Sequence, residues 1–97
     1  MIGMATRHNL YTLSNSTATR VSPEGVHSGI DITLQNVHET AYVYIGSSTV
    51  TTSNYGYRIA PGHAISWELS GRDSLYAISD TNGSKLAVLR TNLEGGQ

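Results

Sequence analysis

Apolar and polar residues alternate along several short stretches of this chain. The clearest stretch covers residues 29–36, in which aliphatic and polar side chains take turns: Ile30, Ile32 and Leu34 against Asp31, Thr33 and Gln35. An alternation with a period of two is typical of a β-strand that has one face buried and the other in water. We therefore predict a strand here, with its three aliphatic residues in the core.

The same alternation, read together with turn-forming residues, predicts seven more strands, at residues 7–13, 18–21, 41–45, 57–59, 64–69, 75–79 and 85–90. Residues 36–40 have the length of a hairpin loop, so the strands on either side of it are expected to pair antiparallel. Residues 80–83 are expected to form a tight hairpin turn of the Asn-Gly kind. Eight short strands at this spacing predict an all-β fold: a single β-sandwich or small barrel with mainly antiparallel strands.

One stretch, residues 42–62, combines a strand, a loop and a second strand. Its polar part, residues 47–54, is interrupted only by Val50, so we expect a surface loop with one apolar anchor. Trp67 follows in the next predicted strand. We expect its side chain in the core or at the rim of the core, where the indole N–H can still find an acceptor.

Length and composition fit this picture. The chain has 97 residues, the size of one domain, and Ser and Thr supply 23 of them while Phe and Cys are absent. We expect a β-sandwich domain at residues 7–91, between a flexible N-terminal arm at 1–6 and a flexible C-terminal tail at 92–97. A domain of this size without disulfides is stable by a small margin, so we expect oligomerisation to add buried surface.

Charge and hydropathy argue against two classes of partner. The formal net charge is −1, and the 6 basic and 7 acidic residues are scattered, so no basic stripe is present to neutralise phosphates. No run approaches the roughly 20 apolar residues of a membrane helix, and the first residues lack the pattern of a signal peptide. We therefore expect neither a nucleic acid nor a membrane as a partner.

Residues that could catalyse a reaction or bind a metal do not form a recognisable motif. No cysteine accompanies the four histidines, which are far apart in the sequence: His8, His27, His38 and His63. The Gly-x-Ser-x-Gly motif of a nucleophilic serine is absent. The carboxylates fall at outward strand positions or in turns, where a solvated charge is the ordinary explanation. We expect no enzymatic activity, no metal and no cofactor.

Five residues are candidates for contact with another protein: Tyr55, Tyr57, Arg58, Arg72 and Asp73. Tyr and Arg are enriched at protein interfaces because each combines contact area with a directional polar end. A β-protein without Phe also needs Tyr in its core, so a structural role for the tyrosines stays open.

Four segments carry a resemblance to a known family: Tyr-Val-Tyr-Ile-Gly at 42–46, Val-Thr-x-x-x-Tyr-Gly-Tyr-x-Ile-x-Pro-Gly at 50–62, Arg-Asp-Ser-Leu-Tyr-Ala-Ile-Ser at 72–79 and Leu-Ala-Val-Leu-Arg at 86–90. In their pattern and spacing they resemble small β-domain structural proteins of tailed bacteriophages, over residues 26–91. The resemblance brings no catalytic or binding residues with it.

This resemblance implies a non-enzymatic virion structural protein, namely a capsid decoration (cement) protein. Such a protein is expected to be a homotrimer that binds the major capsid protein on the capsid exterior, after a period in the host cytoplasm during assembly. The alternative is a phage tail or baseplate binding module that contacts host carbohydrate through Trp67 and the loop tyrosines.

Overall fold

The computed structural model describes residues 6–22, 30–69 and 74–92, with only the backbone described at Trp67 and Asn92. These residues contain no helix, and they form eight strands: β1 (Thr6–Thr12), β2 (Thr19–Arg20), β3 (Ile30–Asn36), β4 (Val43–Gly46), β5 (Tyr57–Ile59), β6 (Ala64–Leu69), β7 (Tyr76–Ser79) and β8 (Lys85–Asn92). All eight predicted strands are present, with bounds close to those expected.

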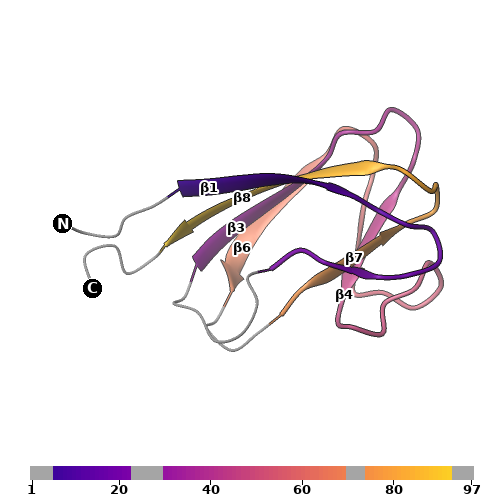
Figure 1. Cartoon of the computed structure of the whole chain (residues 1–97), viewed down its shortest axis with the longest axis horizontal. Helices are drawn as coiled ribbons and strands as arrows, with labels where there is room; N and C mark the ends of the chain where they lie inside the picture. Colours follow the sequence, from indigo (N-terminus) through magenta and orange to yellow (C-terminus); the bar gives the residue numbers. More distant parts are fainter. Residues whose placement is uncertain (1–5, 23–29, 70–73, 93–97) are drawn as a thin grey trace.

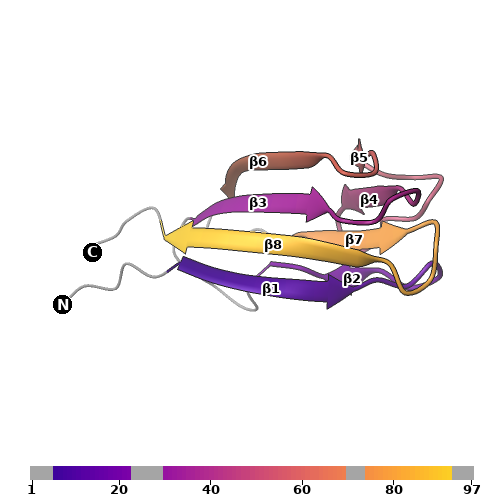
Figure 2. The same cartoon turned by 90° about the horizontal axis from the view of Figure 1, so that it is seen from above.

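The strands form two antiparallel sheets that pack face to face. Sheet A has the strand order β1-β8-β3-β6 and sheet B the order β2-β7-β4-β5. Figure 1 shows the two layers from the side, and Figure 2 looks onto sheet A with sheet B behind it. The first strand pairs with the last, the second with the seventh, the third with the sixth and the fourth with the fifth. This arrangement is a jelly roll, so the predicted all-β class is confirmed in its sandwich form.

The two predicted hairpins are wrong. Strand β3 pairs with β6 and β8 in sheet A, whereas β4 pairs with β5 and β7 in sheet B, so β3 and β4 are not partners. Strands β7 and β8 also lie in different sheets. Turn-forming residues mark where the chain reverses, but they do not determine whether the next strand stays in the same layer. Of the eight described strands, only β4 and β5 are neighbours both in sequence and in a sheet.

The connection between β7 and β8 bonds to the segment that follows β1. The Gly83 N–H donates to the Leu13 carbonyl (2.9 Å), and the Leu13 N–H donates to the Ser84 carbonyl (2.7 Å). The Ser79 N–H donates to the Ser14 carbonyl (3.1 Å). Gly83 has a φ of 88°, a conformation that favours glycine. These bonds tie two crossings between the layers together, which explains why residues 80–83 do not close a hairpin.

The core lies between the inner faces of the two sheets. Its largest cluster draws aliphatic residues from both layers: Leu13, Val21, Ile30, Ile32, Leu34, Val43, Ile45, Ile59, Leu69, Leu75, Ala77, Leu86 and Val88. The alternation predicted for residues 29–36 is confirmed, because the three aliphatic side chains of β3 are buried and the side chains between them are exposed or half-buried. Period two therefore reports the buried face of this strand correctly.

One buried polar side chain, Asn36 at the end of β3, joins three segments of the chain. Its Nδ2 group donates to the carbonyls of Ala41 (2.8 Å) and Ile59 (3.0 Å), and its Oδ1 accepts from the N–H of His38 (3.0 Å). Asn36 is fully buried, with 0 % exposure, so these bonds replace its contacts with water. They hold the turn after β3 and the end of β5 against the core.

Several predictions fall outside the described residues. They concern the ends of the chain at residues 1–5 and 93–97 and the position of the Trp67 side chain. The division into an arm, a domain at residues 7–91 and a tail therefore stays a prediction.

Candidate interaction surfaces

Three of the five predicted contact residues lie together at the outer edge of sheet B. Tyr57 and Arg58 belong to the edge strand β5, and Tyr55 lies just before it in the loop that follows β4. The Tyr55 and Tyr57 side chains are 42 % and 47 % exposed, and Arg58 is also exposed. We call these three residues the β5 surface, although consecutive strand residues alternate in direction, so that Tyr57 lies on the same face of β5 as the buried Ile59 and Arg58 lies on the opposite face. Arg72 and Asp73 lie outside the described residues.

The loop at residues 47–56 positions Tyr55. Val50 is buried, as predicted for an apolar anchor, and its N–H donates to the Ser47 carbonyl (3.0 Å). Farther along, the Gly56 N–H donates to the Ile45 carbonyl (2.8 Å). The Tyr55 ring packs on the Tyr44 ring with centroids 4.8 Å apart and planes tilted by 57°. The loop is thus folded against the outer face of sheet B.

Arg58 contacts a tyrosine that immediately precedes the neighbouring strand β4. Its guanidinium carbon lies 4.8 Å from the centroid of the Tyr42 ring, within the range of a cation–π interaction. The side chain therefore has a defined place on the surface. The role of the β5 surface as a contact with a partner stays a prediction.

The two sheets differ in the length of their edge strands. Sheet A ends in β1 and β6, which have 7 and 6 residues, whereas sheet B ends in β2 and β5, which have 2 and 3. Six of the seven residues of β1 are exposed. Its pairing with β8 is continuous from Thr6 to Thr12, without a bulge. Sequence reasoning missed these edges, since an edge is defined by strand order and not by any residue pattern.

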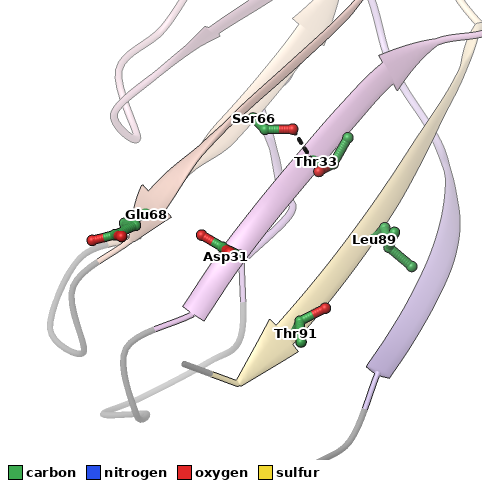
Figure 3. Close-up of a pocket in the computed structure, with 6 residues that line it drawn as sticks. All are labelled: Asp31, Thr33, Ser66, Glu68, Leu89 and Thr91. Atoms are coloured by element: carbon green, nitrogen blue, oxygen red, sulfur yellow. Dashed lines mark hydrogen bonds between the residues drawn. The ribbon is translucent and has the colours of Figure 1, made fainter. Parts of the chain in front are cut away.

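The outer face of sheet A has an apolar centre among polar side chains. Leu10, Ala87 and Leu89 lie on neighbouring strands there, and Leu10 and Leu89 are 61 % and 45 % exposed. Two shallow hollows of about 330 and 350 Å³ open on this face. Figure 3 shows the second hollow, where the Thr33 and Ser66 hydroxyls are hydrogen-bonded (2.6 Å) across β3 and β6.

Charged residues lie near opposite ends of this outer face. Asp31 on β3 is paired directly with Glu68 on β6, so two carboxylates are neighbours at one end. Lys85 lies at the other end, at the start of β8, where its Nζ donates to the Thr12 hydroxyl (2.7 Å). We call Leu10, Ala87, Leu89 and these three charged residues the sheet A face.

The described residues contain neither a metal-binding cluster nor a membrane-spanning helix. No group of three or more His, Asp or Glu side chains in the described segments is arranged to hold a metal ion. His27 lies outside those segments. Across residues 6–22, 30–69 and 74–92, no helix is long and apolar enough to cross a membrane.

Comparison with known proteins identifies the fold. No family model matches the chain, and no curated protein matches it. Among solved structures, the chain is similar to a protein of Bacillus endospore appendages, which are described as a novel family of disulfide-linked pili. The TM-score is 0.56 and the sequence identity 14 %, over 95 % of this chain and 88 % of that one. The similarity therefore extends over the whole sandwich.

This match overturns the expected resemblance to structural proteins of tailed bacteriophages. Four predictions depended on that resemblance and are wrong. They are the capsid-decoration function, the tail-module alternative, the homotrimer that binds the major capsid protein, and the virion location. The resemblance was wrong because short alternating strands separated by Gly and Pro turns are common to many β-sandwiches. The matched protein is a component of pili.

Proposed function

We propose that this protein is a non-enzymatic structural subunit that assembles with copies of itself into a fibre. The subunits pair through the two long edges of sheet A, β1 of one copy beside β6 of the next. The observation that carries this proposal is the pair of long, open edge strands on the same sheet. Such edges present unpaired N–H and C=O groups that can add a further strand.

The strand directions in sheet A suit this assembly. Every pair in the sheet is antiparallel, so β1 and β6, at the two ends of a sheet with four strands, run in opposite directions. A copy shifted sideways without rotation therefore places its β1 antiparallel to β6 of its neighbour. The new pair has the same geometry as those inside the sheet. A head-to-tail contact of this kind does not close on itself, and repetition produces a filament.

The contrast between the sheets supports the same proposal. Proteins that stay monomeric protect their sheet edges with short strands, bulges, proline or lysine. Sheet B has short edge strands, whereas β1 and β6 are longer and contain neither proline nor lysine. Of the two sheets, sheet A has the edges that are open to pairing.

The fold match supports assembly into a fibre, and the sequence indicates that its subunits are not linked by disulfides. The similar protein belongs to disulfide-linked pili, but this chain contains no cysteine. Subunits of this chain are therefore held by hydrogen bonds and packed side chains alone. We further propose that the β5 surface, formed by Tyr55, Tyr57 and Arg58, is a second contact between subunits.

Proline substitution in β1 tests the edge pairing. Along an edge strand, alternate N–H groups point toward the sheet and away from it. Of the two variants His8→Pro and Asn9→Pro, one therefore removes an N–H that points outward, and the other removes an N–H that bonds to β8. The variant that keeps the wild-type melting temperature is the one to use. We expect its critical concentration for fibre formation to rise by about tenfold or more, because the loss of one or two hydrogen bonds weakens each contact by about 1–2 kcal/mol.

Ser48→Pro is the matched control. Ser48 is the second residue of the turn closed by the Val50 N–H and the Ser47 carbonyl, a position where proline is favoured. This variant should form fibres as the wild type does. The proposal would be contradicted if the folded β1 proline variant formed fibres as well as the Ser48→Pro control. It would also be contradicted by a wild type that stays monomeric at millimolar concentration. A closed dimer would instead indicate that β1 pairs with β1 of a second copy.

A further inference from the structure

The sheet A face has the composition of a surface that packs against another sheet. Its centre consists of Leu10, Ala87 and Leu89. Ala87 is paired with Gln35 and Leu89 with His8, and the other uncharged residues of the face are Thr, Ser and Ala, which stand only a short way above the sheet. Two sheets pack closely when their facing side chains are small and apolar at the centre. The exposed fractions of Leu10 and Leu89 show that no part of the described chain covers this centre.

The charges on this face are separated along the strands. Lys85 and Thr91 mark the two ends of β8 on this face, and Asp31 is paired with Thr91. Six residues of strand correspond to roughly 20 Å, so Lys85 cannot reach Asp31 or Glu68 within one chain. One end of the face is therefore acidic and the other end basic.

We propose that the sheet A face binds the same face of a second copy, with the strands of the two copies reversed. The two-fold axis lies between the copies and runs across the strands. It places the leucines of both copies together at the centre. It also brings Lys85 of each copy to the acidic end of the other, which carries Asp31 and Glu68. The contact between lysine and carboxylates therefore forms twice.

Charge selects this orientation and this occupant. A two-fold axis parallel to the strands would place the acidic ends of both copies together, and like charges across an interface are unfavourable. The reversed orientation pairs every acidic end with a lysine. The face carries both halves of the complementary pattern, which is the requirement for a symmetric contact between identical chains. The contact uses side chains of the face and not the backbone edges, so it does not depend on the proposed fibre.

A charge-reversal series tests the contact. Lys85→Glu and Asp31→Lys should each weaken self-association at least tenfold in sedimentation equilibrium, since each replaces an attraction by a repulsion. An equimolar mixture of the two single variants should associate again. In that mixed dimer the introduced glutamate of one chain meets the introduced lysine of the other, while the second contact keeps the original pair of Lys85 and Asp31. Glu39→Lys, at an exposed position in the turn after β3, is the control and should change nothing. If fibres form, the series is carried out in the proline variant that blocks the edge, and that variant is the reference for every comparison.

Zero-length cross-linking gives an independent result. Lys85 is the sole lysine of the 97 residues. A carbodiimide should therefore join it to Asp31 or Glu68 in a dimer, and a mixture of isotope-labelled and unlabelled protein should show that the link is between chains. Leu89→Gln should abolish the dimer. The subunit should stay folded, because Leu89 is exposed. A monomer at millimolar concentration, a dimer that ignores the charge reversals, or a mixture that does not recover would each overturn the proposal. Loss of the fibre in the proline variant would not affect it.

Discussion

Asn36 shows how much depends on a single buried polar side chain. Its amide satisfies two carbonyls and accepts one N–H, and these partners come from the turn after β3 and from the end of β5. In the sequence it reads as the first residue of a loop. The polarity of Asn predicts a turn. Only the packing around Asn36 shows that its side-chain hydrogen bonds are made to the backbone and not to water.

Replacing Asn36 with alanine should lower the free energy of unfolding by about 2–4 kcal/mol, because three hydrogen bonds are lost and buried carbonyls are left without a donor. Urea denaturation measures the change. Gln35→Ala, next in the chain but exposed on the outer face of sheet A, is the control and should stay within about 0.5 kcal/mol of the wild type. A loss below about 1 kcal/mol for Asn36→Ala would show that water takes over these bonds.

Tyr57 offers a test of the β5 surface at the same scale. Its ring is nearly half exposed, so Tyr57→Ser should leave the melting temperature almost unchanged. If the β5 surface is a contact between subunits, the same substitution should lower the rate and extent of fibre formation, measured by light scattering. Ser53→Ala in the adjacent loop is the control. Unchanged assembly of Tyr57→Ser would remove this residue from the interface.

At the scale of the elements, the loop at residues 47–56 depends on Val50. This side chain packs with Tyr44 and Ile78, and a Cβ added at Gly46 would lie 3.2 Å from its Cβ and Cγ2 atoms. The loop thus has a small cluster of its own on the outer face of sheet B. The single apolar residue in a polar run was a sufficient signal to predict this anchor from the sequence.

Val50→Ala should cost about 1–2 kcal/mol of stability, at about 0.8 kcal/mol for each buried methylene equivalent. It should also weaken the near-ultraviolet circular dichroism that arises from Tyr44 and Tyr55, since their contact depends on the loop. Ser48→Ala, exposed in the same loop, serves as the comparison. If Val50→Ala loses the expected stability but keeps the tyrosine signal of the wild type, the loop is held by other contacts.

The positions of the strands could be predicted from the sequence, but their partners could not. Period two determines which side chains of a strand face the core, as in β3, and it carries no information about which strand lies alongside. The hairpins expected around residues 36–40 and 80–83 failed for this reason. The candidate surfaces divide in the same way: the β5 surface was visible as a cluster of Tyr and Arg, whereas the sheet A face combines β1, β3, β6 and β8, which only the topology brings together.

At the scale of the whole molecule, the absence of cysteine separates this chain from the disulfide-linked pili that contain its structural relative. If the protein assembles as proposed, its fibres should keep their length in dithiothreitol, as measured by electron microscopy, because the chain has no cysteine to form a reducible link. Guanidinium chloride, which unfolds the subunits, should dissolve them. Fragmentation by the reductant alone would show that another disulfide-containing component links the subunits.

The position of β8 has a consequence for how the chain folds. This strand is the last of the eight, yet it lies between β1 and β3 in the middle of sheet A. A chain emerging from the ribosome therefore cannot build sheet A until residues 85–92 are available, and until then β1 and β3 both lack their shared partner. Contacts between strands so far apart in sequence form slowly, on the order of milliseconds to seconds. During that interval the unfilled place beside β3 is open to a strand from another nascent chain, so synthesis at high density favours domain-swapped chains.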